Sequence, residues 1–225
     1  MEIKEIGYLK TPFKTKFGVP RQSGAVKSSK ATLVFNEPFQ NSEALRGLDG
    51  YSHVWVIWGF SECEKTEFSP TVRPPRLGGN TRVGVFASRS PFRPNGLALS
   101  VLKLEKIEKT EKHGHVLRLS GADMMDNSPV YDIKPYLPQF DSIPYATGGF
   151  STEIENYRLT VIFPEDIKRE LDTELIDRLT DILSEDPRPS YINTPDRVYG
   201  FLYDNYEIKF TVQSKELTVI SIEKK

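Results

Sequence analysis

Arginine, asparagine and proline cluster in one segment of this chain, between two apolar runs. Arg89, Arg93 and Asn95 lie there, together with Pro91 and Pro94. Proline fixes φ and restricts the residue before it, so this loop is largely shaped before any ligand arrives. Guanidinium and amide groups on such a loop suit a polar, anionic or nucleotide-like ligand. A proline-rich turn with solvated arginines is an equally good interpretation of the composition.

Three further segments combine polar side chains with turn-forming residues. They are Pro20-Arg21-Gln22, the stretch 73–80 with its prolines and glycines, and the stretch 123–136 with three carboxylates, a lysine and two tyrosines. Asp132 and Lys134 are two residues apart, so on a strand they share one face. The alternative interpretations are an exposed turn, a solvated hairpin tip and a surface ion pair of little energetic value.

Metal, thiol and serine-hydrolase chemistry find little support in the sequence. Cys63 is the single cysteine, and three histidines are too few for a convincing metal site. His53 lies in an apolar run, which favours a core histidine over a catalyst. The chain has no P-loop and no GxGxxG after a strand, so a nucleotide-like cofactor is expected to bind without a Rossmann fold.

Composition indicates an ordinary globular protein, with 38% hydrophobic and 27% charged residues in a chain of 225. No signal-peptide core and no run of transmembrane length is present. We therefore expect a cytoplasmic protein with no membrane partner. The net charge of -1 divides into +5 over residues 1–149 and -6 over residues 150–225. This asymmetry is compatible with a nucleic-acid substrate held by the first part.

Residues 1–149 show the pattern of many short strands, which favours a β-barrel or sandwich. The run 51–60 is almost continuously apolar, which predicts a central strand buried on both faces. One short helix is expected, capped by Asn41 or Ser42. The other expected strands cover 2–9, 31–35, 83–86, 97–107 and 116–119.

The composition changes after Gly148-Gly149 and becomes acidic. An apolar stripe at helical spacing predicts one amphipathic helix over 166–184. Three strands, over 199–206, 207–213 and 217–222, are expected to follow as a small β-meander. Residues 150–225 are therefore predicted to form a small α+β domain that packs on the first.

Several motifs occur in the order typical of one known family. They are PRQ at 20–22, SHVW at 52–55, VRPPRLGG at 72–79, GVFASRSPFRPN at 84–95, DIKPYLP at 132–138 and DPRPSY at 186–191. On these motifs the chain resembles the TsaA-like β-barrel family, in particular its S-adenosylmethionine-dependent tRNA (adenine-37-N6)-methyltransferases of the TrmO type. Asn127-Ser128 replaces the Gly-Thr of the family turn, and asparagine is the best substitute for glycine where φ is positive.

The resemblance implies a mainly β fold, with a TsaA-like barrel over 1–149 that binds S-adenosylmethionine and a small α+β domain over 150–225 that can contact tRNA. It also implies a homodimer, with the cofactor site formed together with a neighbouring subunit, and methylation of N6 of threonylcarbamoyladenosine at position 37 of the anticodon loop. No metal is implied. The implied cofactor shell comprises Pro20, Arg21, Gln22, Ser61, Glu62, Arg89, Leu99, Ser120, Gly121, Ala122 and Asp123.

Methyl transfer requires an aligned nucleophile and a group that accepts its proton. Candidate catalytic residues near the implied shell are Asp132, Lys134, Tyr136 and Asp126. Candidate tRNA contacts, through charge and stacking, are Arg73, Arg76, Arg93, Lys134, Arg188 and Tyr191. Two other functions remain open: a non-catalytic sensor of S-adenosylmethionine or a nucleoside, and a tRNA-binding accessory protein.

Overall fold

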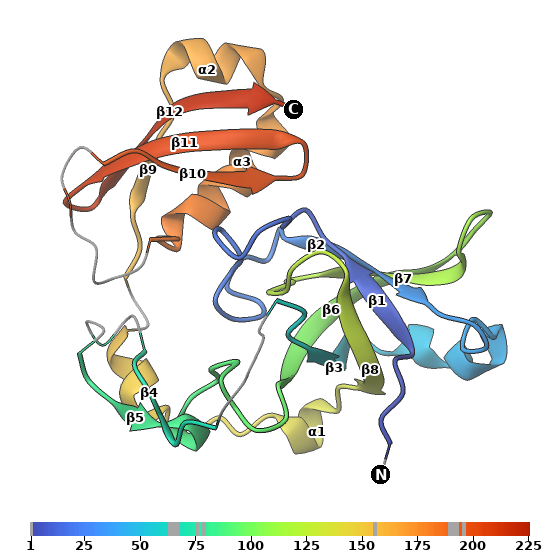
Figure 1. The fold of residues 1–225 in the computed structure, drawn as a ribbon. Coiled ribbons are helices and arrows are strands. Elements are labelled where there is room, and N and C mark those ends of the chain that lie inside the picture. The colour runs from blue at the N-terminus through green and yellow to red at the C-terminus, as the bar shows by residue number, and fades with distance from the viewer. Residues whose placement is uncertain are drawn as a thin grey trace.

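Two units lie side by side in the protein, a barrel and a smaller α/β unit (Figure 1). The computed structural model describes residues 2–62, 68–74, 77, 80–154, 157–188, 194 and 197–225. The structure confirms the mainly β fold class, with a closed six-stranded barrel followed by a small unit of helices and strands.

The barrel closes in the strand order β1-β2-β7-β6-β3-β8, and every neighbouring pair is antiparallel. Closure leaves no free sheet edge along the paired strands. The strands are β1 (Gly7–Lys10), β2 (Lys30–Phe35), β3 (His53–Gly59), β6 (Leu97–Thr110), β7 (Gly114–Ser120) and β8 (Ser128–Pro135).

Strand β3 is buried on one face only, so the prediction of burial on both faces is wrong. Val54, Val56 and Trp58 point into the barrel and are at most 5% exposed. Trp55 and Ile57 alternate with them and are only half-buried on the outside. His53 shares that outer face, so the prediction of a core histidine is wrong as well.

The connections between barrel strands contain short helices and one small separate sheet. Asn41 caps the first of these helices by accepting a hydrogen bond from the backbone N of Glu43 at 2.9 Å. It is one of the two caps that the sequence predicts. The expected strand over 83–86 exists only as β5 (Val83–Gly84), which pairs with β4 (Thr71–Val72) outside the barrel. The helical segments are η1 (Ser42–Leu45), η2 (Leu48–Gly50), η4 (Val85–Ala87) and α1 (Pro138–Asp141).

The C-terminal unit is a four-stranded sheet covered by helices. The expected meander is confirmed as β10-β11-β12. A further strand, β9, pairs in parallel with β12, so the strand order is β10-β11-β12-β9. The single predicted helix is two helices, because the backbone is extended at Leu171 and Asp172. Asp172 caps the second helix by accepting a hydrogen bond from the backbone N of Leu175 at 2.7 Å. The elements are β9 (Thr160–Ile162), α2 (Glu165–Glu170), α3 (Thr173–Ser184), β10 (Tyr199–Tyr203), β11 (Tyr206–Gln213) and β12 (Glu216–Lys224). The short helix η5 (Gly149–Ile154) precedes this unit in the chain and lies apart from its sheet in Figure 1.

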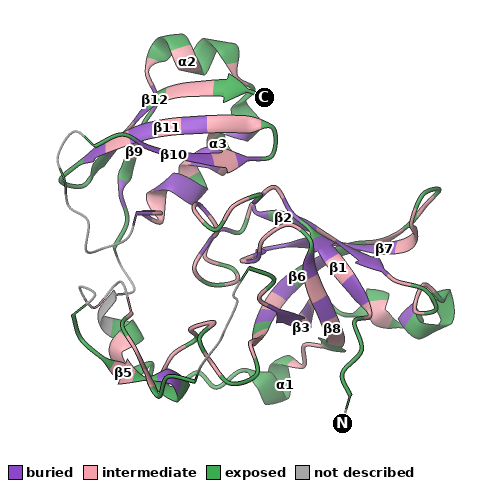
Figure 2. Cartoon of the chain, viewed as in Figure 1, coloured by how far each residue is buried: buried purple, intermediate pink, exposed green. Residues whose placement is uncertain are grey.

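Each unit has its own apolar core, which Figure 2 shows in purple along the barrel strands, α3 and the C-terminal sheet. The boundary between the cores does not follow the order of the chain. Phe13 and Val26, from the segment between β1 and β2, are at most 1% exposed and belong to the core of the C-terminal unit. We call residues 11–29 the connector, because they touch both units.

Candidate active site

The connector approaches the segment after β7 very closely. The backbone N of Gly24 donates to the carbonyl of Gly121 at 2.9 Å. Both glycines have positive φ, and a Cβ at Gly121 would lie 3.3 Å from the N of Gly24. Glycine at 121 therefore leaves room for the approach, and both positions have the positive φ that glycine adopts freely. The approach places Ser23 and Gly24, which directly follow the predicted segment 20–22, against residues 121–123.

Asp123 is held in a hydrogen-bonded chain that leads into the barrel. Ser100 Oγ donates to Asp123 Oδ1 at 2.7 Å, and Trp58 Nε1 donates to Ser100 Oγ at 3.0 Å. Burial raises the pKa of the Asp123 carboxyl from 3.8 to about 6, while hydrogen bonds from Ser100 and the Ser23 backbone and the charge of Arg89 oppose the rise. At neutral pH this carboxyl is mostly ionised although burial disfavours its charge, so a cation bound beside it would stabilise the carboxylate.

Arg89 reaches the connector from the proline-rich loop. Its guanidinium donates to Gln22 Oε1 at 2.5 Å, and the Arg89 side chain remains exposed. Strand β7 pairs with β6 only from Lys103 onward, and before that point Ser23 Oγ accepts from the backbone N of Val101 at 3.3 Å. Leu99, beside Ser100 on β6, is 50% exposed. The structure thus brings Gln22, Arg89 and Asp123 together at one end of the barrel.

The other predicted cofactor residues differ in what they offer. The side chain of Ser120 is 4% exposed and donates to Glu105, and Ala122 is fully buried, so these two offer only backbone groups. Ser61 and Glu62 follow β3 and are exposed, with the Glu62 carbonyl accepting from Lys16 Nζ.

Arg21 is directed away from the cluster around Asp123. Its guanidinium donates to the carbonyls of Asp186 and Arg188 in the C-terminal unit, at 3.1 and 2.7 Å. The neighbouring Pro20 is buried.

Three of the predicted catalytic residues follow one another on the outer face of β8 and just beyond it. Lys134 Nζ lies 3.0 Å from Asp132 Oδ2, so the expected shared face is confirmed. Tyr136 packs its ring 5.8 Å from Trp55 and 6.2 Å from His53, measured between centroids. This half-exposed aromatic group beside an ion pair offers stacking and proton-accepting groups on one surface.

Trp55, Trp58 and Ser100 are site residues that the sequence reasoning missed. Trp55 donates through Nε1 to Asp141 of α1 at 3.0 Å, which fixes the aromatic surface. The signal for Trp55 was its position in the SHVW motif beside His53. No sequence pattern links Trp58 and Ser100 to Asp123, since their contact arises only from strand register.

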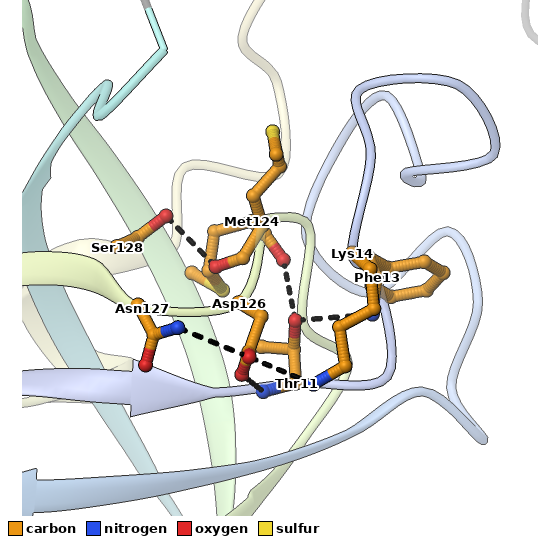
Figure 3. Close-up of polar contacts among 8 residues, drawn as sticks. Thr11, Phe13, Lys14, Met124, Asp126, Asn127 and Ser128 are labelled. Atoms are coloured by element: carbon orange, nitrogen blue, oxygen red, sulfur yellow. Dashed lines mark hydrogen bonds and ion pairs between the residues drawn. The ribbon is translucent and has the colours of Figure 1, made fainter. Parts of the chain in front are cut away.

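Asp126 lies apart from the other predicted catalytic residues, in the structural cluster of Figure 3. Its carboxylate accepts from the backbone N of Thr11 at 2.9 Å and from Lys14 Nζ at 2.7 Å. Asn127 adds a contact at 3.2 Å and has φ 60, the positive value that its place in the family turn suggested. These contacts tie the turn before β8 to the connector.

Comparison with known proteins places the chain among tRNA methyltransferases. Residues 8–142 match the model of the tRNA-methyltransferase O N-terminal domain, and residues 156–225 match that of the TrmO C-terminal domain. The chain belongs to the TrmO family. Membership confirms the resemblance, and the first model spans every described residue of the candidate site around Asp123 and Asp132.

Relatives within the TrmO family match along most or all of the chain. The tRNA (adenine(37)-N6)-methyltransferase of Escherichia coli K12 is 35% identical over 230 residues, which cover 99% of this chain and 97% of that protein. The protein of the same name from Eikenella corrodens is 43% identical and covers 72% of this chain and 92% of its own. A crystal structure of TrmO from Pseudomonas aeruginosa superposes with a TM-score of 0.81 at 30% identity, covering 100% of this chain and 97% of the other.

The predicted tRNA contacts of this TrmO-family chain are spread over both units. Arg73 is exposed beside β4, and Arg93 donates to the Ser88 carbonyl at 3.0 Å. Arg188 does not fit a phosphate contact, because it is 7% exposed and pairs with Asp186 at 2.8 Å. Arg76 and Tyr191 lie outside the described residues.

No group of three or more histidine, cysteine, aspartate or glutamate side chains in the described part of the chain could hold a metal ion. None of the helices among the same residues is long and apolar enough to cross a membrane.

Proposed function

We infer that this TrmO-family chain transfers a methyl group from S-adenosylmethionine to N6 of the adenosine at tRNA position 37. The full-length match to the Escherichia coli enzyme of that activity carries this conclusion. We also propose that this adenosine carries a threonylcarbamoyl group, as the resemblance to the family implies.

The residues at the end of the barrel fit S-adenosylmethionine by the chemistry of their polar groups. Its carboxylate requires a donor such as Arg89, and its ammonium and sulfonium require acceptors such as Asp123 and the carbonyls of 120–123. The half-exposed Leu99 offers an apolar surface for the adenine. When bound there, the cofactor supplies an electrophilic methyl group.

The chain must orient the acceptor N6 and take its proton. We propose that Asp132 accepts this proton and that Lys134, paired with it at 3.0 Å, holds the carboxylate in position. The rings of Tyr136 and Trp55 form a surface on which an unstacked base can lie. Asp126 is proposed only as a structural residue, because its carboxylate is already bound by Thr11 and Lys14.

We further propose that the barrel domain, residues 1–149, binds the cofactor and that residues 150–225 contact tRNA. A homodimer completes the site in this proposal. It is supported by exposed apolar side chains around β5 and α1, where Phe86 is 72%, Phe140 is 75% and Tyr145 is 88% exposed. Size-exclusion chromatography with light scattering tests the dimer, and a strictly monomeric protein refutes it.

Nucleoside mass spectrometry tests the reaction. tRNA that carries threonylcarbamoyladenosine is incubated with the protein and S-adenosylmethionine, and a gain of one methyl on that nucleoside is expected. Unmodified tRNA in parallel shows whether the threonylcarbamoyl group is required. No gain on either tRNA, with cofactor binding measured separately, contradicts the proposed function.

Asp132→Ala and Asp126→Ala form a matched pair for the mechanism. We expect Asp132→Ala to bind cofactor but to lose turnover by about 100-fold or more, as removal of a proton acceptor does. Asp126→Ala should lower thermal stability and retain turnover below its melting point. Normal turnover by Asp132→Ala would remove Asp132 from the mechanism.

A further inference from the structure

The connector joins two parts of the molecule that are far apart in sequence. On its barrel side, Gln22 accepts from Arg89 and Gly24 donates to Gly121, which places it beside the candidate cofactor site. On its other side, the connector lies against the C-terminal unit, and Figure 1 shows its blue loops between the barrel and α3.

Contacts with the C-terminal unit extend along the whole connector. At its start, Phe13 forms a β-bridge with Tyr203, and their rings lie 5.7 Å apart. In the middle, Phe17 stacks on Tyr199 and Phe210 at 6.4 Å each. Toward its end, Ser28 Oγ donates to Asp181 of α3 at 2.6 Å.

Arg21 lies between these two sets of contacts. It directly precedes Gln22 and Ser23, which meet Arg89 and Asp123. Its own guanidinium donates instead to the carbonyls of Asp186 and Arg188, just after α3. A small cleft of about 260 Å³ runs beside this contact, and both Arg21 and Arg188 line it.

The turn at 186–188 that receives Arg21 is itself held by an internal ion pair. Asp186 binds the Arg188 guanidinium through both oxygens, at 2.8 and 2.9 Å, and this Arg188 is 7% exposed. A bidentate, largely buried pair of this kind fixes geometry. The two carbonyls that Arg21 meets therefore have a fixed position.

We propose that Arg21 is a positioning residue that sets the affinity of the cofactor site through the C-terminal unit. This role rests on the proposed function. It means that the Arg21 side chain binds the turn at 186–188 and not the cofactor. Holding Arg21 there fixes Gln22 and Ser23 next to Arg89 and Asp123. Any partner that displaces the 186–188 turn must then change cofactor affinity, and the cofactor must change that partner's affinity equally.

The test measures S-adenosylmethionine binding to the full chain by calorimetry. Arg21→Ala should weaken Kd by roughly tenfold, within the usual range of coupling between sites. Arg21→Lys should fall between Arg21→Ala and the wild type, because an ammonium on a shorter side chain replaces the guanidinium Nη2 that donates to both carbonyls. Asp186→Asn keeps a residue that tolerates the φ of 50 there but removes the charge that pairs with Arg188, so it should weaken Kd in the same direction.

Non-additivity and a matched control separate positioning from direct contact. The double variant Arg21→Ala/Asp186→Asn should bind no more weakly than Arg21→Ala alone, since both act through one contact. Ser28→Ala removes another contact between the same units, to Asp181, and should bind like the wild type. In steady-state assays, Arg21→Ala should raise KM for the cofactor while kcat at saturation changes less than about twofold.

Three results would overturn the proposal. Wild-type affinity in Asp186→Asn together with weak binding in Arg21→Ala would make Arg21 a direct cofactor contact. Additive effects in the double variant would do the same, and unchanged Kd in all variants would leave Arg21 without a role in affinity. A wild-type protein that binds no S-adenosylmethionine refutes the proposed function instead. Should Arg21→Ala fail to fold, Arg21→Lys and Asp186→Asn carry the comparison.

Discussion

Replacing Asp123 with asparagine should change both the pH dependence of stability and the affinity for the cofactor. The carboxyl pKa rises from 3.8 to about 6 on folding because of burial. At about 1.36 kcal/mol per pKa unit, ionised Asp123 costs the folded state on the order of 3 kcal/mol.

The sign of this effect follows from proton binding. Between pH 3.8 and about 6 the folded state binds more protons at Asp123 than the unfolded chain does. The contribution of Asp123 to stability therefore falls as pH rises through this range, and it is constant above it. About half of the total, on the order of 1.5 kcal/mol, is lost between pH 5 and pH 8.

Urea unfolding of wild type and Asp123→Asn at pH 5 and pH 8 measures the difference directly. Asparagine can still accept from Ser100 but carries no charge, so Asp123→Asn should gain about 1.5 kcal/mol relative to wild type on going from pH 5 to pH 8. Cofactor affinity should move the other way. Wild type should bind S-adenosylmethionine more tightly above pH 6, and Asp123→Asn should bind about tenfold more weakly at pH 8 with no such pH dependence. A stability difference that does not change with pH would refute the buried, pKa-shifted carboxyl.

Three further measurements check other parts of the structure. Asn127→Ala should lower stability by about 1 kcal/mol because alanine tolerates the φ of 60 poorly, while Asn127→Gly should not, and equal melting temperatures for both would contradict the strained turn. Asp172→Ala should lower the free energy of unfolding, measured in urea, by about 1 kcal/mol, and Asp172→Ser should lower it much less because serine also caps helices. An unchanged free energy in Asp172→Ala would show that the cap does not stabilise the protein. Filter binding should show tRNA affinity that falls steeply with salt, and a flat response would count against an extended phosphate contact.

The barrel and the meander could be predicted because they depend on local patterns. Strands such as β2 and β7 alternate or run apolar over a few residues, and their turns contain glycine or asparagine. The break between α2 and α3 could also have been predicted, since an aspartate before a new apolar stripe is an N-cap signal. One long helix is predicted instead because the apolar stripe continues over residues 166–184, and that prediction does not use Asp172 as an N-cap.

The error on β3 and the contacts of two arginines have a long-range cause. The outer face of β3 is apolar because Trp55 packs against Tyr136, a residue that β8 brings alongside by register. The sequence does not reveal the partners that Arg21 and Arg188 have in the fold: Arg21 donates to carbonyls of the C-terminal unit, and Arg188 pairs with Asp186. Whether a charged side chain faces solvent or a partner depends on tertiary packing, which residue spacing does not encode.

That Phe13 and Val26 fill the core of the C-terminal unit has a consequence for the order of events during synthesis. These residues leave the ribosome early, while Tyr199, Phe201 and Phe210, which belong to the same core, follow much later in the chain. The six barrel strands, of which β8 is the last in the chain, are complete well before then and can close around their own core. Until translation reaches β10 and β11, the apolar side chains of the connector therefore remain uncovered beside a folded barrel. In that state the connector is the segment that a chaperone would protect.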